Sequence, residues 1–450
     1  MRIIIVGIGK LGEYLTKSLV REGHEITVID TYFNKHENII NNEDVNYIEG
    51  NALNANILKE AGAASADLLI CAMDKDEQNV MCSLLAKKLG TKHTIARIRN
   101  TEYASSISLL KDDLGLSLTI NPDLLTAEYI YNVLSIPTAI NTTSFFKGKV
   151  EMISLKVKED SVIKNLTLNK IANKLDRIII CAIERKNKII IPKGTTKFLE
   201  DDKVYITGTP QSINKFLIYL KRIGEKTKKV IICGGSETAV YLSRLLIDSG
   251  MTTKIIEDNE ERCQKLSEEL PQALIIHGDV SNQNVLYEEG IEKADAFVSL
   301  TGIDEENIIY SMFASSLNVP KVITKINHIN LEGILDKANI DTVITPHIIA
   351  SNQIVSYIRA MENSTGSSCE ALYKFEEEAF EMLEFNIKND FKGLDTKLRN
   401  LKFKEGILII AIQRGKNIII PNGNDEIKEK DIIVIIDNKN QVKNINDIIE

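Results

Sequence analysis

The 450-residue sequence contains one long pattern twice. The N-terminal run IIIVGIGKLGEYLTKSL matches VIICGGSETAVYLSRLL about 227 positions later, and LLICAMDKDEQNVMCSLLAKKLG matches FVSLTGIDEENIIYSMFASSLNV. A later segment matches as well, since IERKNKIIIPKGTTKFLEDDKVYI corresponds to IQRGKNIIIPNGNDEIKEKDIIVI. Such a repeat constrains the fold strongly, because both halves must form the same architecture. The chain is therefore predicted to be a tandem duplication.

Each half divides into two unlike pieces. The first alternates β-branched runs such as RIIIVG, EITVID and VNYIEG with helical patterns, which is typical of a parallel sheet with helices on both faces. A helical stretch is also expected between EITVID and VNYIEG. The second piece has short strands split by turn residues, which predicts a mainly antiparallel domain with one helix. The predicted fold is α/β, with two Rossmann-like doubly wound lobes, each followed by a small α+β lobe. The predicted domains are residues 1–138, 139–224, 225–366 and 367–450.

Composition excludes several classes of protein. The net charge of −8 works against binding to nucleic acid or to an anionic lipid surface. No apolar run approaches the about 20 residues that cross a bilayer, so we expect a cytoplasmic protein that does not insert into the membrane. The six cysteines are scattered without a CxxC pair, so neither a disulfide framework nor a metal site is expected.

The first repeat unit carries GIGKLG between a predicted strand and a predicted helix. In such a motif Gly7 permits a tight turn, Gly9 lets the backbone approach a pyrophosphate, and Gly12 lets the helix pack closely on the sheet. Asp30 ends the second strand, where its carboxylate can accept hydrogen bonds from both hydroxyls of a ribose. The glycine motif and Asp30 together favour NAD over NADP, because the Asp30 carboxylate would repel the 2′-phosphate of NADP. The alternative is a glycine-rich corner that binds nothing.

More candidate side chains follow the later strands of this unit. Met73 and Asp74 come after the fourth predicted strand, and Arg97 ends the fifth. Ligands bind at the carboxyl edge of a doubly wound sheet, so Arg97 is a candidate phosphate ligand, and Asn51 is expected near the adenosine. Two alternatives stay open: Arg97 could form a surface ion pair, and Asp76 could simply start a helix.

The second repeat unit keeps this pattern in altered form. Gly234 keeps the first glycine, whereas Ser236 and Ala239 replace the second and the third. Glu257 aligns with the ribose carboxylate of the first unit, and Lys325 aligns with its arginine. Ser236 adds a side chain where the backbone should approach a pyrophosphate, although its hydroxyl could itself donate to phosphate. We therefore expect nucleotide binding here to be weaker than, or different from, that in the first unit.

The sequence shows no recognisable set of catalytic residues. A dehydrogenase needs an acid–base side chain and a substrate clamp, yet residues 150–208 contain no histidine. No GxSxG, HExxH or P-loop motif occurs either. Cofactor binding without catalytic residues predicts a sensor rather than an enzyme. An NAD-dependent oxidoreductase with an unrecognised substrate is the alternative, and an adenine-nucleotide-sensing scaffold without a transport role is a third hypothesis.

Together, IIIVGIGKLGEYL, ITVID, the segment IARIR and the doubled Ile-Pro-x-Gly resemble the TrkA family over essentially the whole chain. Its members are regulatory subunits of Trk potassium-uptake systems, built from duplicated RCK (regulator of potassium conductance, or KTN) domains. The resemblance implies a cytosolic homo-oligomer that forms a ring of RCK domains. The ring would lie at the inner face of the cell membrane and gate an integral-membrane potassium transporter of the Trk type. It would respond to NAD or NADH, or to ATP or ADP.

The resemblance also suggests roles for individual segments. The helices that begin at Pro122 and Pro346 resemble the crossover helices that join neighbouring lobes in this family, and an ordinary final helix on the sheet is a compatible alternative. Met73 departs from the family pattern, in which small hydroxyl residues are common at this position. The candidate cofactor-binding residues are Gly7, Ile8, Gly9, Lys10, Leu11, Gly12, Asp30, Asn51, Met73, Asp74 and Arg97 in the first unit, and Gly234, Gly235, Ser236, Glu237, Thr238, Glu257, Asp279, Thr301, Gly302 and Lys325 in the second.

Overall fold

The chain forms two compact units, one made of Met1–Tyr131 with Lys228–Ile354 and the other of Asn132–Thr227 with Val355–Glu450. The first unit holds the two parallel-sheet lobes, and the second holds the two small lobes. The expected helical stretch before VNYIEG and the three predicted domain boundaries lie outside the described residues, so the boundaries stay predictions. The computed structural model describes residues 1–32, 44–100, 103, 106–107, 114–135, 142–146, 148–186, 188–221, 227–327, 340, 342–364, 369–375, 380–438, 442 and 444–450.

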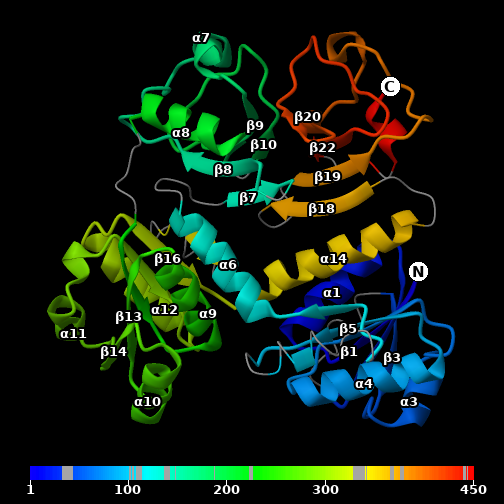
Figure 1. Ribbon diagram of the computed structural model, residues 1–450, viewed down its shortest axis with the longest axis vertical. Coiled ribbons are helices and arrows are strands. Elements are labelled where there is room, and N and C mark those ends of the chain that lie inside the picture. Colours follow the sequence, from blue (N-terminus) through cyan, green and yellow to red (C-terminus); the bar gives the residue numbers. More distant parts are fainter. Residues whose placement is uncertain are drawn as a thin grey trace. The chain divides into compact units, whose positions relative to one another are not determined.

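The first lobe is a six-stranded parallel sheet in the order β3-β2-β1-β4-β5-β6 (Figure 1). Sequence patterns predict five of these strands, whereas the three-residue β6 is too short to show a periodicity of its own. The elements are β1 (Arg2–Val6), α1 (Lys10–Arg21), β2 (Glu25–Asp30), β3 (Val45–Glu49), α3 (Ala55–Glu60), β4 (Leu68–Cys71), α4 (Asp76–Leu89), β5 (His93–Arg97), β6 (Leu118–Ile120) and α6 (Pro122–Ser135).

Helices cover both faces of this sheet. Alternate residues of a strand face opposite sides, and Ile4 and Val6 of β1 share a core cluster with Leu58 of α3. On the other face, a Cβ placed on Gly12 of α1 would lie 3.7 Å from Cγ2 of Ile5. Because both faces are covered, four of the five residues of β1 are buried, as a continuous apolar run requires. This arrangement confirms the predicted doubly wound fold.

The second lobe repeats the first strand for strand, in the order β14-β13-β12-β15-β16-β17. Its α10 stands where the helical stretch is expected in the first lobe. None of the helices in the described ranges is both long enough and apolar enough to cross a bilayer. The elements are β12 (Lys229–Cys233), α9 (Glu237–Asp248), β13 (Thr252–Glu257), α10 (Glu260–Glu269), β14 (Leu274–His277), α11 (Gln283–Glu288), β15 (Ala296–Ser299), α12 (Asp304–Ser316), β16 (Lys321–Lys325), β17 (Thr342–Ile344) and α14 (Pro346–Ser364).

The two small lobes are five-stranded antiparallel sheets with matching orders, β10-β9-β11-β8-β7 and β21-β20-β22-β19-β18. The first ends in helix α8, which Thr209 caps and Pro210 begins, whereas a 3₁₀ helix at Ile445–Ile448 follows the last strand of the second. The elements are β7 (Thr142–Phe145), β8 (Val150–Lys156), α7 (Leu168–Ile171), β9 (Ile178–Arg185), β10 (Lys188–Ile190), β11 (Lys203–Gly208), α8 (Pro210–Tyr219), β18 (Cys369–Phe375), β19 (Phe380–Asn386), β20 (Ile407–Arg414), β21 (Asn417–Ile419) and β22 (Ile432–Asp437).

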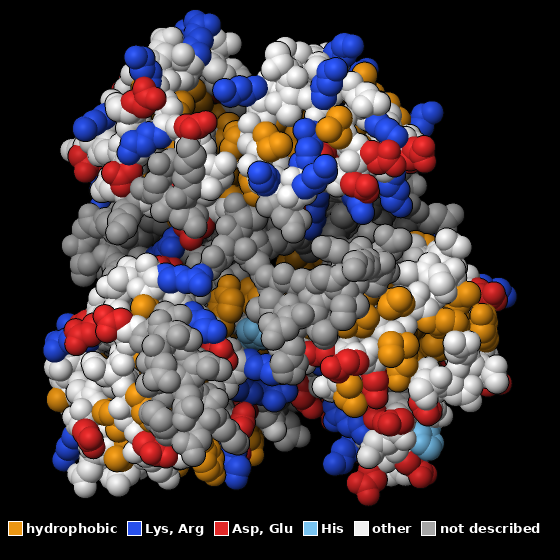
Figure 2. All heavy atoms as spheres, turned by 180° about the vertical axis from the view of Figure 1, so that it is seen from behind, with side chains coloured by type: hydrophobic (Ala, Val, Ile, Leu, Met, Phe, Trp, Pro, Cys, Tyr) orange, Lys and Arg blue, Asp and Glu red, His pale blue; other side chains and the backbone are white. Residues whose placement is uncertain are grey.

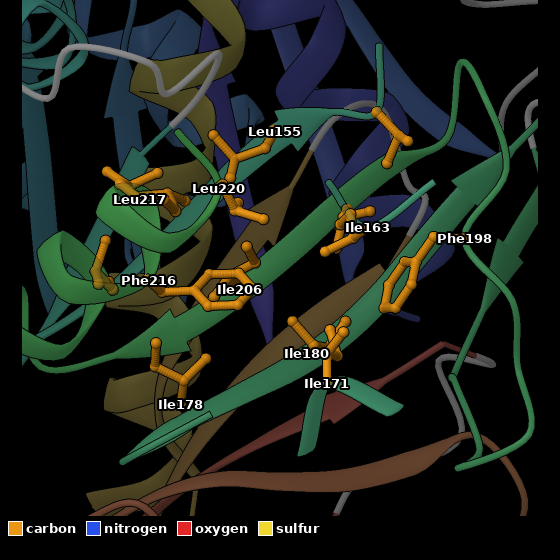
Figure 3. Packing of buried hydrophobic residues seen from close by; sticks show 14 of the residues in the cluster. Leu155, Ile163, Ile171, Ile178, Ile180, Phe198, Ile206, Phe216, Leu217 and Leu220 are labelled. Atoms are coloured by element: carbon orange, nitrogen blue, oxygen red, sulfur yellow. The ribbon is translucent and has the colours of Figure 1, made fainter. Parts of the chain in front are cut away.

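Apolar packing holds the second unit together. In the first small lobe, Phe216 of α8 and Phe198 pack over isoleucines of the sheet such as Ile206 (Figure 3). A separate cluster draws on both small lobes, and the rings of Tyr205 and Phe380 meet edge to face with centroids 5.1 Å apart. A shared apolar core of this kind explains why the two small lobes form one compact unit.

In each small lobe an arginine pairs with a buried aspartate at the same place in the repeat. Arg185 donates from Nε and Nη2 to the two carboxylate oxygens of Asp202, each over 2.7 Å, and Arg414 makes the same pair of bonds to Asp431 at 2.9 and 2.7 Å. Both carboxylates are 1% exposed. Asp202 also accepts from the N–H of Leu199. Each pair therefore joins the end of one strand to the turn that precedes another.

We expect Asp202→Ala to lower the free energy of unfolding by about 2 kcal/mol, because the backbone N–H of Leu199 loses its acceptor and Arg185 keeps only its bond to the carbonyl oxygen of Lys197. Urea denaturation followed by circular dichroism measures the change. Glu200→Ala is the matched control, since Glu200 pairs with Lys164 at the surface and its loss should cost less than about 1 kcal/mol. Equal shifts for the two variants would contradict the prediction.

Candidate nucleotide-binding sites

The first glycine turn joins β1 to α1. Gly7 has φ +89°, a left-handed value that other residues rarely adopt, and a Cβ on it would lie 3.0 Å from the backbone of Met73. A Cβ on Gly12 would collide with the carbonyl oxygen of Gly7. Gly9, by contrast, is exposed, and a Cβ there would meet nothing within 4 Å. Two glycines are thus required for packing, and the middle one leaves open space at the helix N-terminus.

The residues around Gly9 alternate between core and solvent. Ile8 and Leu11 are buried, so they present only their backbone to the turn, whereas Lys10 is exposed at the start of α1. Among the residues that the structure describes, no side chain caps the N-terminus of this helix. The first N–H groups of α1 therefore face outward beside a lysine, an arrangement suited to phosphate.

Asp30 lies beside this turn. Its Oδ2 accepts from the N–H of Ile8 at 2.7 Å, and its Oδ1 accepts from the N–H of Tyr32 at 3.1 Å. The carboxylate therefore holds the glycine turn and the backbone that follows β2.

Asn79 connects the ends of two neighbouring strands. Fully buried, it accepts at Oδ1 from the N–H of Met73 and donates from Nδ2 to the carbonyl oxygens of Met73 and Arg97, each over 2.9 Å. Sequence reasoning assigned it no role, although its coincidence with Asn307 in the repeat was a usable signal. Asn79 sets the position of the backbone at two candidate residues.

Arg97 lies at the edge of the first sheet with only 15% of its side chain exposed. Its Nη1 is 3.5 Å from the carbonyl oxygen of Ala72 and 4.0 Å from the carboxylate of Asp74, which is fully exposed. Burial lowers the pKa of Arg97, and the positive charge of Arg99 lowers it further. The arginine is therefore a largely buried cation that also forms a long ion pair with the exposed Asp74.

Asp76 combines two roles. It belongs to the first turn of α4, as expected, and its Oδ2 also accepts from the N–H groups of Arg99 and Asn100 at 2.9 and 2.8 Å. Asn51 has a local role as well, since its side chain accepts from the N–H of Leu53 in the turn after β3. Both residues organise the backbone at the carboxyl edge of the sheet.

The second turn repeats this geometry. Gly234 has φ +93°, and the N–H of Gly235 donates to Oε2 of Glu257 at 2.6 Å. Asn307 accepts from the N–H of Thr301 and donates to the carbonyl oxygen of Lys325. The longer Glu257 therefore performs the backbone task that Asp30 performs in the first lobe.

Two residues, Ser236 and Arg262, characterise the second turn. Ser236 stands in the place of Gly9, and its hydroxyl oxygen is buried without a hydrogen-bond partner among the described residues. Arg262 of α10 donates from Nε to the carbonyl oxygen of Gly235 at 2.7 Å and approaches Glu237 to 3.2 Å. The corresponding first-half residue lies outside the described ranges. Arg262, which sequence reasoning missed, adds a positive charge directly at the second turn.

The remaining candidates of the second lobe lie at or just after the carboxyl ends of its later strands. Lys325 is 9% exposed, its Nζ donates to the carbonyl oxygen of Leu300 at 3.1 Å, and burial lowers its pKa. Gly302 is exposed. Asp279 is also exposed, and the hydrogen bond from Ser281 lowers the pKa of its carboxyl group. Lys325 resembles Arg97 in being a partly desolvated cation, whereas Asp279 mainly forms a turn.

Helix starts link the two parallel lobes. Asn121, just before α6, donates to the hydroxyl of Tyr241 on α9 at 2.9 Å, and Asp123 accepts from the hydroxyl of Thr238. From the second lobe to the first, the ring of His347 on α14 meets the ring of Tyr14 on α1, with centroids 6.0 Å apart. Both helices thus contact the other lobe where they begin, as the crossover interpretation requires.

Most of the chain matches known domain families, in the order that the repeat predicts. Residues 3–122 and 230–346 match the TrkA-N domain, and residues 152–221 and 382–450 match the TrkA-C domain. The chain belongs to the TrkA family. The TrkA-N matches contain both glycine turns, and the TrkA-C matches contain the small lobes.

Full-length relatives carry the TrkA name. A Trk system potassium uptake protein TrkA homolog of Archaeoglobus fulgidus is 30% identical, with 100% of each chain covered. The Trk system potassium uptake protein TrkA of Vibrio alginolyticus is 28% identical over 99% of this chain and 98% of its own. These relatives are transport proteins and not enzymes, which confirms the prediction that this TrkA-family chain is not an NAD-dependent oxidoreductase.

Solved structures share the fold of this TrkA-family chain. The crystal structure of the GsuK RCK domain is 17% identical, with a TM-score of 0.64 over 97% of this chain and 92% of that one. A GsuK channel bound to NAD is 16% identical, with a TM-score of 0.63 over 97% of this chain and 77% of that one. At these identities the likeness shows the tandem RCK fold.

Gly12→Ala should destabilise the first lobe by at least about 2 kcal/mol, because its methyl group would collide with the backbone of Gly7 and push α1 away from the turn. Gly9→Ala is the matched control, since a methyl group there meets open space and should change stability by less than about 1 kcal/mol. Thermal unfolding compares the two variants. A Gly9→Ala variant as unstable as Gly12→Ala would refute the packing argument.

Proposed function

We propose that this TrkA-family chain is a cytosolic regulatory subunit that binds adenine nucleotides at its two glycine turns and thereby gates a Trk-type potassium transporter. One observation carries the proposal: in each lobe the carboxylate that the sequence predicts at the ribose, Asp30 or Glu257, accepts a hydrogen bond from the glycine turn. Ligand can switch a transporter only through different affinities for two conformations of the assembly. Binding at the edge where the two lobes meet would provide that difference.

The proposed ligands are NAD and NADH, with ADP and ATP as alternatives. A carboxylate at the ribose favours a free 2′-hydroxyl, as NAD has and NADP lacks. One GsuK channel structure is titled as bound to NAD, and another GsuK structure, 14% identical with a TM-score of 0.51 over 81% of this chain and 69% of that one, is titled as bound to ADP. The proposed contacts are the candidate residues predicted from the sequence.

The two sites are proposed to differ in affinity. The first has open space at Gly9, where a pyrophosphate can approach the backbone. In the second, Ser236 reduces that space, and Arg262 is already engaged with Gly235 and Glu237. A ligand there would have to rearrange or share these contacts. The second site should therefore bind a dinucleotide more weakly than the first.

The proposed partners are an integral-membrane potassium transporter of the Trk type and further copies of this chain in a ring of RCK domains. The names of the relatives support the first. Exposed apolar side chains support the second, since Ile309 and Met312 of α12 are 61% and 44% exposed, and Met81 on α4, the repeat counterpart of Ile309, is 52% exposed. On the face drawn in Figure 2, acidic and basic side chains are interspersed, and hydrophobic side chains lie between them.

Calorimetric titration of the full-length chain with NADH, NAD, ADP and ATP tests the ligand proposal. The isolated halves should bind NADH with unequal affinity, the first half more tightly. Asp30→Ala should weaken the tighter site by about tenfold or more, because it removes the ribose acceptor and loosens the turn at Ile8. Glu257→Ala should affect only the weaker site. Equal affinities of the two halves would contradict the proposed difference.

Co-purification from membranes tests the partner proposal. Tagged chain incubated with solubilised membranes should retain a potassium-translocating membrane protein, and the amount retained should change with nucleotide. Thermal stabilisation by nucleotide without any retained transporter would favour the nucleotide-sensing scaffold instead. A monomeric chain whose melting temperature no nucleotide shifts would count against the whole proposal.

A further inference from the structure

A buried carboxylate of the first lobe reaches the glycine turn of the second. Asp123, in the first turn of α6, is 8% exposed. Its Oδ1 accepts from the hydroxyl of Thr238 at 2.7 Å, and its Oδ2 accepts from Nε of Arg99 at 2.8 Å. Thr238 lies in the first turn of α9 and is 1% exposed. All three residues belong to the unit of parallel lobes.

The two partners of Asp123, the hydroxyl of Thr238 and the guanidinium of Arg99, are groups that commonly bind phosphate. The N-terminal turn of a helix attracts negative charge, and a hydroxyl and a guanidinium are common phosphate donors. At the second turn a protein carboxylate already uses both donors. Asp123 therefore supplies negative charge next to the place where the proposed nucleotide would bring its own.

The negative charge of Asp123 also raises the pKa of two cations, Lys325 in the second lobe and Arg97 in the first. Burial lowers the pKa of Lys325, and Asp123 is the strongest influence that opposes this shift. Its charge also raises the pKa of Arg97 in the first lobe, after the nearer Asp74. A single buried carboxylate is thus a common counter-charge for cations of both candidate sites.

The repeat is asymmetric at this position. The counterpart of Asp123 in the second half is His347, whose ring packs against Tyr14 of α1. A carboxylate from the opposite lobe therefore reaches the second turn, whereas an aromatic ring approaches the first helix. The two positions are equivalent in the repeat, but the Asp123–Thr238 contact involves a carboxylate and the His347–Tyr14 contact involves two aromatic rings.

We propose that Asp123 is a counter-charge through which the first lobe limits phosphate binding at the second turn. The inference rests on the proposed function, since it concerns the affinity of the second nucleotide site. An incoming phosphate must share Arg99 and Thr238 with this carboxylate or displace it, and the two negative charges repel each other at close range. Asp123 is thus a positioning residue that sets the affinity of a site in the neighbouring lobe.

The test separates the charge from the hydrogen bond. Asp123→Asn removes the charge but leaves an oxygen that can accept from Thr238, whereas Thr238→Val removes the hydrogen bond but keeps the charge. Each change is made in full-length chain that also carries Asp30→Ala, so that calorimetric titration with ADP reports mainly the second site. We expect Asp123→Asn to bind ADP at least about tenfold more tightly, which is the effect of a unit charge about 12 Å away at an effective dielectric constant of about 20, and a nearer charge has a larger effect. Thr238→Val should show no such gain.

Every outcome has a defined meaning. Unchanged or weaker ADP binding by Asp123→Asn overturns the inference while leaving the proposed function intact, and an equal gain in Thr238→Val overturns it as well. Absence of nucleotide binding in the parent chain and in all variants overturns the proposed function and this inference together. Circular dichroism checks folding, and Asp123→Ser, which also removes the charge, provides the measurement if Asp123→Asn does not fold.

Discussion

One hydrogen bond in each parallel lobe determines the geometry of its candidate site. The carboxylate at the end of the second strand accepts from the turn that follows the first strand, at the N–H of Ile8 or of Gly235. The first glycine of each turn has a left-handed backbone that brings this N–H toward the carboxylate. The position of the helix that follows depends on this link. A residue assigned to the ribose is therefore also part of the structure of the turn.

Duplication preserved this backbone frame while the side chains diverged. Asn79 and Asn307 tie the same strand ends, and Asp202 and Asp431 bind arginines at the same place in the two small lobes. These buried polar groups satisfy backbone or charged partners, so a change would leave an unpaired group in the interior. The substitution at Ser236 lies at the turn itself, where a side chain alters ligand access without disrupting the core.

Much of the architecture could be predicted because the repeat supplied two examples of most strands and of both glycine turns. The strands, the glycine turns and the carboxylates that end the second strands followed from local patterns of a few residues. The three-residue β6 could not, since it is too short for a periodicity. The role of Asn79 was also missed, because its partners, Met73 and Arg97, are six and eighteen residues away and become neighbours only when two strands lie side by side.

By itself the sequence determined the duplication, the doubly wound fold and the residues that form each turn, because these depend on local geometry and on which residues are apolar. Only the tertiary structure decided that Arg262 lies over the second turn and that Asp123 reaches Thr238 in the other lobe. Such contacts join residues far apart in the chain, and no local pattern encodes them. The physical reason is that burial of both parallel lobes in one unit selects which charged groups become neighbours.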